Sequence, residues 1–107
     1  MEQLKLNLIL RALDDKLAED IKVIDVSEKT PFFTYYVVAT VKNQRQGLAC
    51  IESIEENFEK SSLTIRGSEG KRGSDWVVID CGEILVHVFT ENERKRISLE
   101  SLWENNK

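Results

Sequence analysis

The sequence predicts a single α/β domain, residues 1–107, in which helices flank a mixed β-sheet. Apolar residues recur at helical spacing in two long segments, and five other segments have the composition of β-strands. A strand–helix–strand crossover beside a run of adjacent strands requires both parallel and antiparallel pairing. At 107 residues, with 41% hydrophobic and 32% charged side chains, the chain has the size and composition of one soluble globular domain.

The first part of the chain is predicted to form a helix followed by two strands. Residues 3–17 repeat Leu and Ile at spacings of three and four, which is typical of an amphipathic helix. Residues 21–26 read as a strand, and residues 27–31, which contain the only proline, break it. Residues 32–41 are dense in Phe, Tyr, Val and Thr, so we expect a second strand there.

A second helix is expected to begin after Asn43. Asn is a favoured N-cap, and Gln46 three residues later completes a capping-box pattern. After this helix we expect a short strand at 63–66 and a loop containing several glycines at 67–73. Two strands joined by a tight turn follow at 76–81 and 84–89. The chain then continues with a charged turn at 91–96 and a short helix at 98–103. The predicted order is therefore helix, strand, strand, helix, three strands and a final helix.

The charge balance argues against a protein that binds by neutralising phosphates. Nineteen acidic against fifteen basic side chains give a formal charge of −4. That sign suits a basic protein partner, although mild acidity also serves simply to keep a cytosolic domain soluble. The sequence has no apolar run long enough to cross a bilayer and no presequence pattern, so we expect a cytoplasmic protein.

The two cysteines and the single histidine predict no metal site and no cofactor. Cys50 and Cys81 are far apart in the sequence and belong to no CxxC motif, so we expect both to be small buried hydrophobic residues. His87 alternates with Leu85 and Phe89 on one strand face. A general base is one interpretation, but a nucleophile at motif spacing is missing, which favours a hydrogen-bonded structural histidine.

Two carboxylates, Asp80 and Glu83, flank Gly82 between the last two strands. Such a pair can hold a metal ion or perform acid–base chemistry, so a nucleotidyltransferase-like enzyme using both residues is the alternative functional hypothesis. The favoured interpretation is a turn, in which the Asp accepts local backbone N–H groups and the Gly supplies a positive φ.

Trp76, Val78 and Asp80 share one face of their strand, while Val77, Ile79 and Cys81 share the other. The aliphatic row is the better candidate for the core. Trp76 and Val78 would then lie near the surface, with the composition of an interface hot spot. An equally consistent interpretation is that the terminal helix covers this face with Trp103.

These residues, taken in order, resemble the ribosomal silencing factor family, also called Iojap-like proteins. The resemblance covers nearly the whole chain. It rests on the segments Ala12–Lys16, Ala18–Ile21, Asp25–Ser27, Tyr35–Thr40, Arg45–Gln46, Gly67, Trp76–Gly82, Val86–Phe89 and Leu99–Trp103. Three positions depart from the family pattern: Thr34, Val41 and Ile97.

The resemblance implies a nucleotidyltransferase-like topology without enzymatic activity. The sequence agrees, because neither Asp25 nor Asp80 opens the Asp-x-Asp pair that nucleotidyl transfer uses to hold magnesium. The family's function would be to bind a basic ribosomal protein, of the uL14 type, on the intersubunit face of the large ribosomal subunit. Occupying that surface would block the small subunit and repress translation when nutrients are scarce.

The resemblance also implies which residues bind the ribosome. We expect Trp76, Val78 and Asp80 to form the contact, with Tyr35, Arg45 and Gln46 as neighbours. Family members can self-associate, so a homodimer that hides this face is a further expectation.

Overall fold

The computed structural model describes residues 2–70 and 73–96. The predicted helix at 98–103 lies outside the described residues. Within them, no helix is both long enough and apolar enough to span a membrane. The elements are α1 (Glu2–Asp15), β1 (Glu19–Asp25), β2 (Tyr35–Val41), α2 (Gln44–Lys60), β3 (Gly67–Glu69), β4 (Trp76–Asp80), β5 (Ile84–Thr90) and α3 (Glu91–Arg96).

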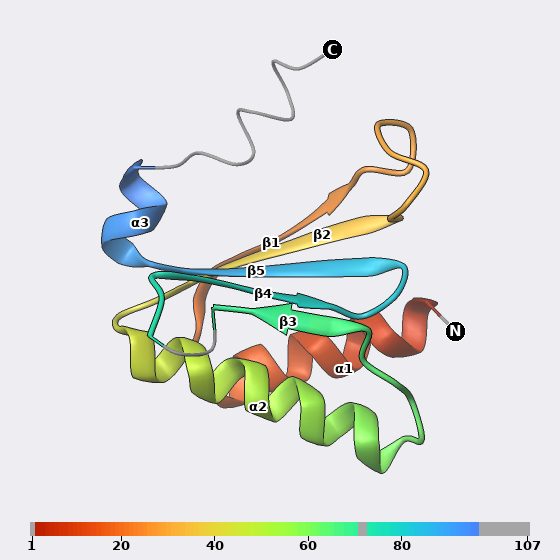
Figure 1. Cartoon of the computed structure of the whole chain (residues 1–107), viewed down its shortest axis with the longest axis horizontal. Helices are drawn as coiled ribbons and strands as arrows, with labels where there is room; N and C mark the ends of the chain where they lie inside the picture. The colour runs from red at the N-terminus through yellow and green to blue at the C-terminus, as the bar shows by residue number, and fades with distance from the viewer. Residues whose placement is uncertain (1, 71–72, 97–107) are drawn as a thin grey trace.

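The strands form one five-stranded sheet in the order β1-β2-β5-β4-β3 (Figure 1). β2 pairs with β5 in parallel, and the other three pairings are antiparallel. The predicted mixed sheet is therefore confirmed. The parallel pair lies at the centre because the chain leaves β2 through α2, builds the β3–β4–β5 meander and returns beside β2.

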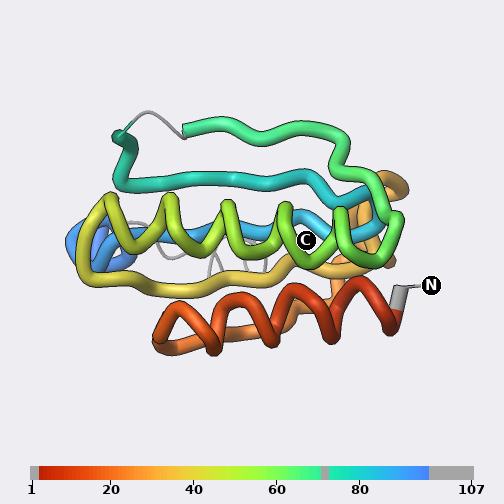
Figure 2. Tube along the Cα trace, turned by 90° about the horizontal axis from the view of Figure 1, so that it is seen from below, coloured from red at the N-terminus to blue at the C-terminus, as the bar shows by residue number. Residues whose placement is uncertain are grey.

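Both long helices cover the same face of the sheet, where they lie side by side (Figures 1 and 2). Their apolar stripes meet the inward-facing residues of β2, β4 and β5, which alternate along each strand. Both cysteines are buried in this layer, as the sequence predicts. The largest side chains buried in this core are Ile9, Leu13, Val37, Ile51, Ile54, Phe58, Ile79, Ile84 and Val86.

The helix ends are set by local hydrogen bonds. α1 stops at Asp15 rather than at Leu17, because Leu17 adopts a left-handed φ of 63° and the N–H of Ala18 bonds back to the carbonyl of Leu13. At the start of α2, the Asn43 side chain accepts from the N–H of Gln46 at 2.9 Å, which confirms the N-cap. The Gln46 side chain does not complete the expected box, since it accepts from the N–H of Lys42 instead.

The strand predicted at 63–66 is wrong, and the strand β3 lies in the segment predicted to be a loop. The N–H of Leu63 closes the end of α2 on the carbonyl of Phe58, and Leu63 and Ile65 pack against the helical layer. Pairing with β4 starts only at Gly67, opposite Asp80, so the edge strand is displaced along the chain.

Two further boundaries differ from expectation. β2 begins at Tyr35 rather than at Phe32, which is 75% exposed in the preceding loop. The charged turn predicted at 91–96 is the helix α3. Thr90 caps it by accepting from the N–H of Glu93, and Arg94 fixes it to the sheet with a 2.7 Å hydrogen bond to Thr40 and an ion pair to Asp20.

Two glycines should respond in opposite ways to alanine. A Cβ at Gly47, in the interior of α2, would meet Val41, Val77 and Val88 only at ordinary contact distances of 3.6–3.8 Å. Gly47→Ala should therefore raise the free energy of unfolding by about 0.5–1 kcal/mol. Gly70→Ala should lower it by at least about 1 kcal/mol, because φ is +87° and the new Cβ would lie 2.7 Å from the carbonyl of Trp76.

Urea unfolding of the two variants and the parent measures both changes. Equal destabilisation by the two substitutions would contradict the packing described for α2.

Candidate functional site

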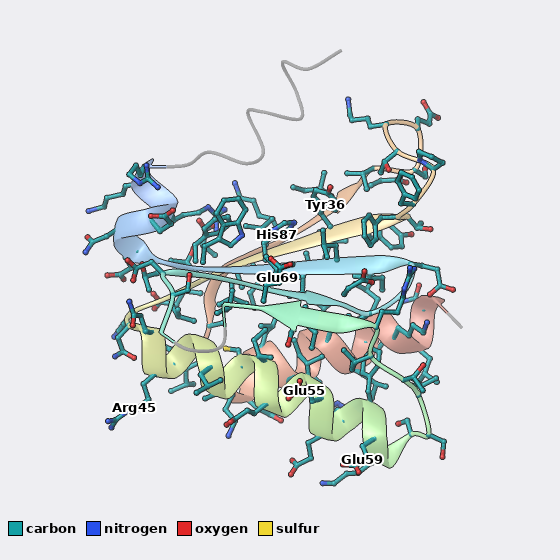
Figure 3. All side chains as sticks on the ribbon, in the orientation of Figure 1. Tyr36, Arg45, Glu55, Glu59, Glu69 and His87 are labelled. Carbon is teal, nitrogen blue, oxygen red and sulfur yellow. The ribbon has the colours of Figure 1, made fainter. Side chains whose placement is uncertain are left out.

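The candidate site is the distal face, defined as the sheet face turned away from α1 and α2. Register places residues of three strands side by side on it: Trp76 lies opposite Phe89, and Val78 lies opposite His87. Val38 of β2 lies beside His87 in the parallel pair. In Figure 3, the labelled side chains of Tyr36 and His87 lie on this side of the sheet, and those of Glu55 and Glu59 lie with the helices.

The predicted division of β4 is confirmed. Val77 and Ile79 are buried toward the helices, whereas Trp76, Val78 and Asp80 are half-buried on the distal face. The next row outward is β3, where Glu69 is exposed opposite Val78. The outer part of the face thus combines an indole, an aliphatic side chain and two carboxylates.

A ring cluster holds Trp76 in place. Its indole lies 4.9 Å from the ring of Phe89, and its Nε1–H donates to Nδ1 of His87 at 3.2 Å. His87 in turn lies 4.9 Å from the ring of Tyr36. Phe89 and Val38, which lie beside these groups on the same face, are fully buried. The tryptophan is therefore fixed in orientation while keeping part of its surface accessible.

His87 is a structural histidine, in agreement with the favoured interpretation. It is 5% exposed, and burial lowers its pKa to about 4, so the ring is neutral at physiological pH. Because Nδ1 accepts the indole N–H, the ring proton resides on Nε2. That Nε2 is buried and has no hydrogen-bond partner among the described residues.

Asp80 and Glu83 each have a local structural role. Asp80 accepts from the N–H of Gly82 at 2.9 Å, and Gly82 has a φ of +97°, so the turn interpretation holds. Glu83 bonds Lys5 of α1 at 2.7 Å, and this hydrogen bond lowers the pKa of the Glu83 carboxyl. Within residues 2–70 and 73–96, no group of three or more His, Cys, Asp or Glu could hold a metal ion.

The three expected neighbours lie away from this face. Tyr35 packs against the helical core, because it precedes Tyr36 and strand neighbours point to opposite faces. Arg45 and Gln46 lie at the start of α2, and the side chain of Arg45 is labelled in Figure 3. Both residues line a shallow hollow of about 710 Å³ at the end of α1 and the start of α2. The Gln46 amide donates to the carbonyls of Lys16 and Leu17, so it joins the two helices.

The structure instead brings Tyr36 and Glu69 to the distal face. Sequence reasoning named neither residue. The signal for Tyr36 was the alternation of β2, in which Tyr36 and Val38 share a face. The position of Glu69 depends on the register between β3 and β4, which the sequence does not reveal when that segment reads as a loop.

The fold and this face together define a small α/β domain whose two long helices lie against the same face of its sheet. Comparison with known proteins identifies it further. The family profile described as "Ribosomal silencing factor during starvation" matches residues 1–107, and the chain belongs to the ribosomal silencing factor family. That family comprises ribosome-acting translation regulators and is not known as an enzyme family.

Individual relatives agree with this assignment. The ribosomal silencing factor RsfS of Chromobacterium violaceum is 34% identical over 100 residues, spanning 94% of this chain and 82% of the relative. The RsfS of Bacillus subtilis is 31% identical over 98 residues, spanning 92% and 83%. A mouse protein named "Mitochondrial assembly of ribosomal large subunit protein 1" is 25% identical, spanning 92% of this chain and 44% of its own length.

Solved structures share the fold. A crystal structure of a Chromobacterium violaceum protein superposes with a TM-score of 0.90 at 33% identity, covering 95% of this chain and 85% of that one. A Bacillus halodurans crystal structure gives a TM-score of 0.85 at 29% identity, covering 94% of both chains.

The buried histidine should make stability depend on pH. The pKa of His87 is about 4 in the folded protein and about 6.5 when unfolded, so the unfolded state takes up the proton first. The stabilisation from neutral His87 is complete above pH 6.5 and is lost as pH falls toward 4. Between pH 7 and pH 5, wild type should lose about 2 kcal/mol more unfolding free energy than His87→Asn.

Urea unfolding at the two pH values measures the difference between the proteins, which removes the contribution of the carboxylates they share. Identical pH dependence would show that His87 is not buried as described.

Proposed function

We propose that this protein acts in the cytoplasm as a silencing factor that binds the large ribosomal subunit and sterically blocks joining of the small subunit. Support comes from its membership of the ribosomal silencing factor family and from the name of the mouse relative, which refers to assembly of the large ribosomal subunit. The mechanism requires affinity and no turnover. Nutrient limitation is the condition in which such repression would operate.

The distal face is the proposed contact surface, and the observation that carries this choice is the state of Trp76. Its indole is half-buried and held by Phe89 and His87, so little side-chain entropy remains to be lost on binding. Rigid aromatic side chains with an accessible edge are the residues that most often dominate the energy of protein interfaces. Val78 and Asp80 extend the contact along β4.

Charge supports a basic partner. Asp80 on β4 and the exposed Glu69 on the edge strand β3 are both acidic, and the chain carries a formal charge of −4. A negative surface accelerates encounter with a positively charged protein and disfavours docking on bare RNA. A basic ribosomal protein of the uL14 type, exposed on the intersubunit face, is therefore the proposed partner.

Sucrose-gradient sedimentation tests this function. Purified large and small subunits are mixed with the protein under conditions in which they normally associate. The proposal predicts that the protein migrates with the large subunit and that the intact-ribosome peak decreases. Protein remaining at the top of the gradient, with normal subunit joining, would refute it.

Two substitutions on β4 test the contact surface. Trp76→Ala should weaken binding to the large subunit by about 2 kcal/mol, or roughly 30-fold, if Trp76 is a hot spot. Val78→Lys should weaken it further, because a like charge would face a basic partner, and its half-exposed position should leave the fold intact.

The matched control is Glu59→Ala on the exposed side of α2, which should bind as wild type does. Circular dichroism and urea unfolding of each variant separate loss of contact from loss of folding. Wild-type affinity of both β4 variants would place the contact elsewhere.

A further inference from the structure

Three basic side chains lie around the hollow at the end of α1 and the start of α2. Lys16 follows α1, while Lys42 and Arg45 lie on either side of the N-cap of α2, and all three are exposed and line the hollow. Asp14 and Glu19 line it as well, yet neither carboxylate forms an ion pair with these cations. On a chain with a formal charge of −4, three cations that no described carboxylate neutralises are therefore gathered in one place.

Other basic side chains of the protein serve the fold. Lys5 joins α1 to the β4–β5 turn, and Arg94 fixes α3 to the sheet. The three side chains around the hollow make no such contact within residues 2–70 and 73–96. Their donors therefore remain available to another molecule.

The Gln46 side chain holds the segments that carry these cations together. Its amide donates to the carbonyls of Lys16 and Leu17 at 2.9 and 3.1 Å, and its oxygen accepts from the N–H of Lys42 at 2.8 Å. Gln46 itself follows Arg45 in the first turn of α2. One side chain thus fixes the backbone at or next to each cation, which reduces the entropy lost when the three contact a ligand.

The hollow lies at the same end of the sheet as Trp76. Gln44, the first residue of α2, donates to the carboxylate of Asp75 at 2.9 Å, and Asp75 directly precedes Trp76. The start of α2 and the start of β4 accordingly lie together in Figure 1, and Arg45 points away from the body of the molecule in Figure 3. A large surface that covers Trp76 can therefore extend to the hollow.

We propose that Lys16, Lys42 and Arg45 bind backbone phosphates of ribosomal RNA next to the protein on which the distal face docks. The inference rests on the function proposed above, because the RNA is that of the large subunit. Lys and Arg donors form charge-assisted hydrogen bonds with phosphate oxygens, and such contacts position a protein without reading base sequence.

The RNA contact adds to the protein contact and does not replace it. The formal charge of −4 opposes binding to RNA alone, because the summed field of the protein repels phosphates at a distance. Once the distal face is docked, the local cations of the hollow are what the neighbouring phosphates meet. The expected signature is therefore a salt-dependent part of subunit binding that Trp76 does not supply.

The salt dependence of binding to purified large subunits tests the proposal. A cation that neutralises a phosphate releases a counterion, so each lost contact should reduce the slope of log K against log salt concentration by about 0.7–1. Lys16→Gln, Lys42→Gln and Arg45→Gln should each have this effect and weaken binding roughly 5-fold at 0.1 M salt. The triple variant should lower the slope by about 2–3.

Two variants serve as controls. Lys60→Gln removes a positive charge at the other end of α2, roughly 25 Å away, and should keep the wild-type slope. Trp76→Ala should weaken binding without changing the slope, because the indole carries no charge. Wild-type slopes in all three hollow variants, with subunit binding intact, would overturn the phosphate contact alone. A wild-type protein that does not bind the subunit would refute the proposed function and this contact together.

Photocrosslinking distinguishes RNA from an acidic protein at the hollow. Glu19→Cys places an exposed thiol there, keeps all three cations and can carry an aryl-azide probe. Burial raises the pKa of the native thiols to about 11 at Cys50 and about 12 at Cys81, so the probe attaches selectively near neutral pH. The proposal predicts a crosslinked partner that ribonuclease digests. A partner that resists ribonuclease and is digested by protease would overturn it.

Discussion

The structure depends on one-sided packing: α1 and α2 both lie against the same face of the sheet. Because side chains alternate along a strand, every residue that enters the helical core leaves its neighbours on the distal face. Val77 and Ile79 are buried, so Trp76, Val78 and Asp80 are presented together. The Lys5–Glu83 hydrogen bond supports this arrangement by joining α1 to the β4–β5 turn. The composition of the distal face is thus a direct consequence of how the core is packed.

Alternation made the central elements predictable. The strand of Trp76 and the start of α2 after Asn43 follow from local pattern and composition alone, and the structure confirms both. The errors concern features that depend on tertiary contacts. β3 occurs at Gly67–Glu69 because Asp80 ends β4 there, and α3 forms at Glu91–Arg96 because Thr40 and Asp20 hold Arg94. Local residue propensity reveals neither the pairing of β3 with β4 nor the contacts that Arg94 makes with β1 and β2.

The candidate site was predictable to a similar degree. The row Trp76, Val78 and Asp80 could be identified as one face from the sequence, since a strand has period two. Its neighbours could not, because they depend on strand order and register. Parallel pairing brings Tyr36 beside Leu85 and Val38 beside His87. Gln46, which belongs to the next segment of the family resemblance, instead connects α2 with the end of α1. Whether Tyr35, Arg45 and Gln46 contact the ribosome remains a prediction.

The most direct test of the account is hydroxyl-radical footprinting of the protein, free and bound to purified large ribosomal subunits. Trp76 on the distal face and Leu4 on α1, which is 46% exposed, report on opposite sides of the molecule. The account predicts that binding suppresses oxidation of Trp76 and leaves Leu4 as reactive as in the free protein. Protection of Leu4 with unchanged oxidation of Trp76 would place the ribosome on the helical side and contradict the central claim.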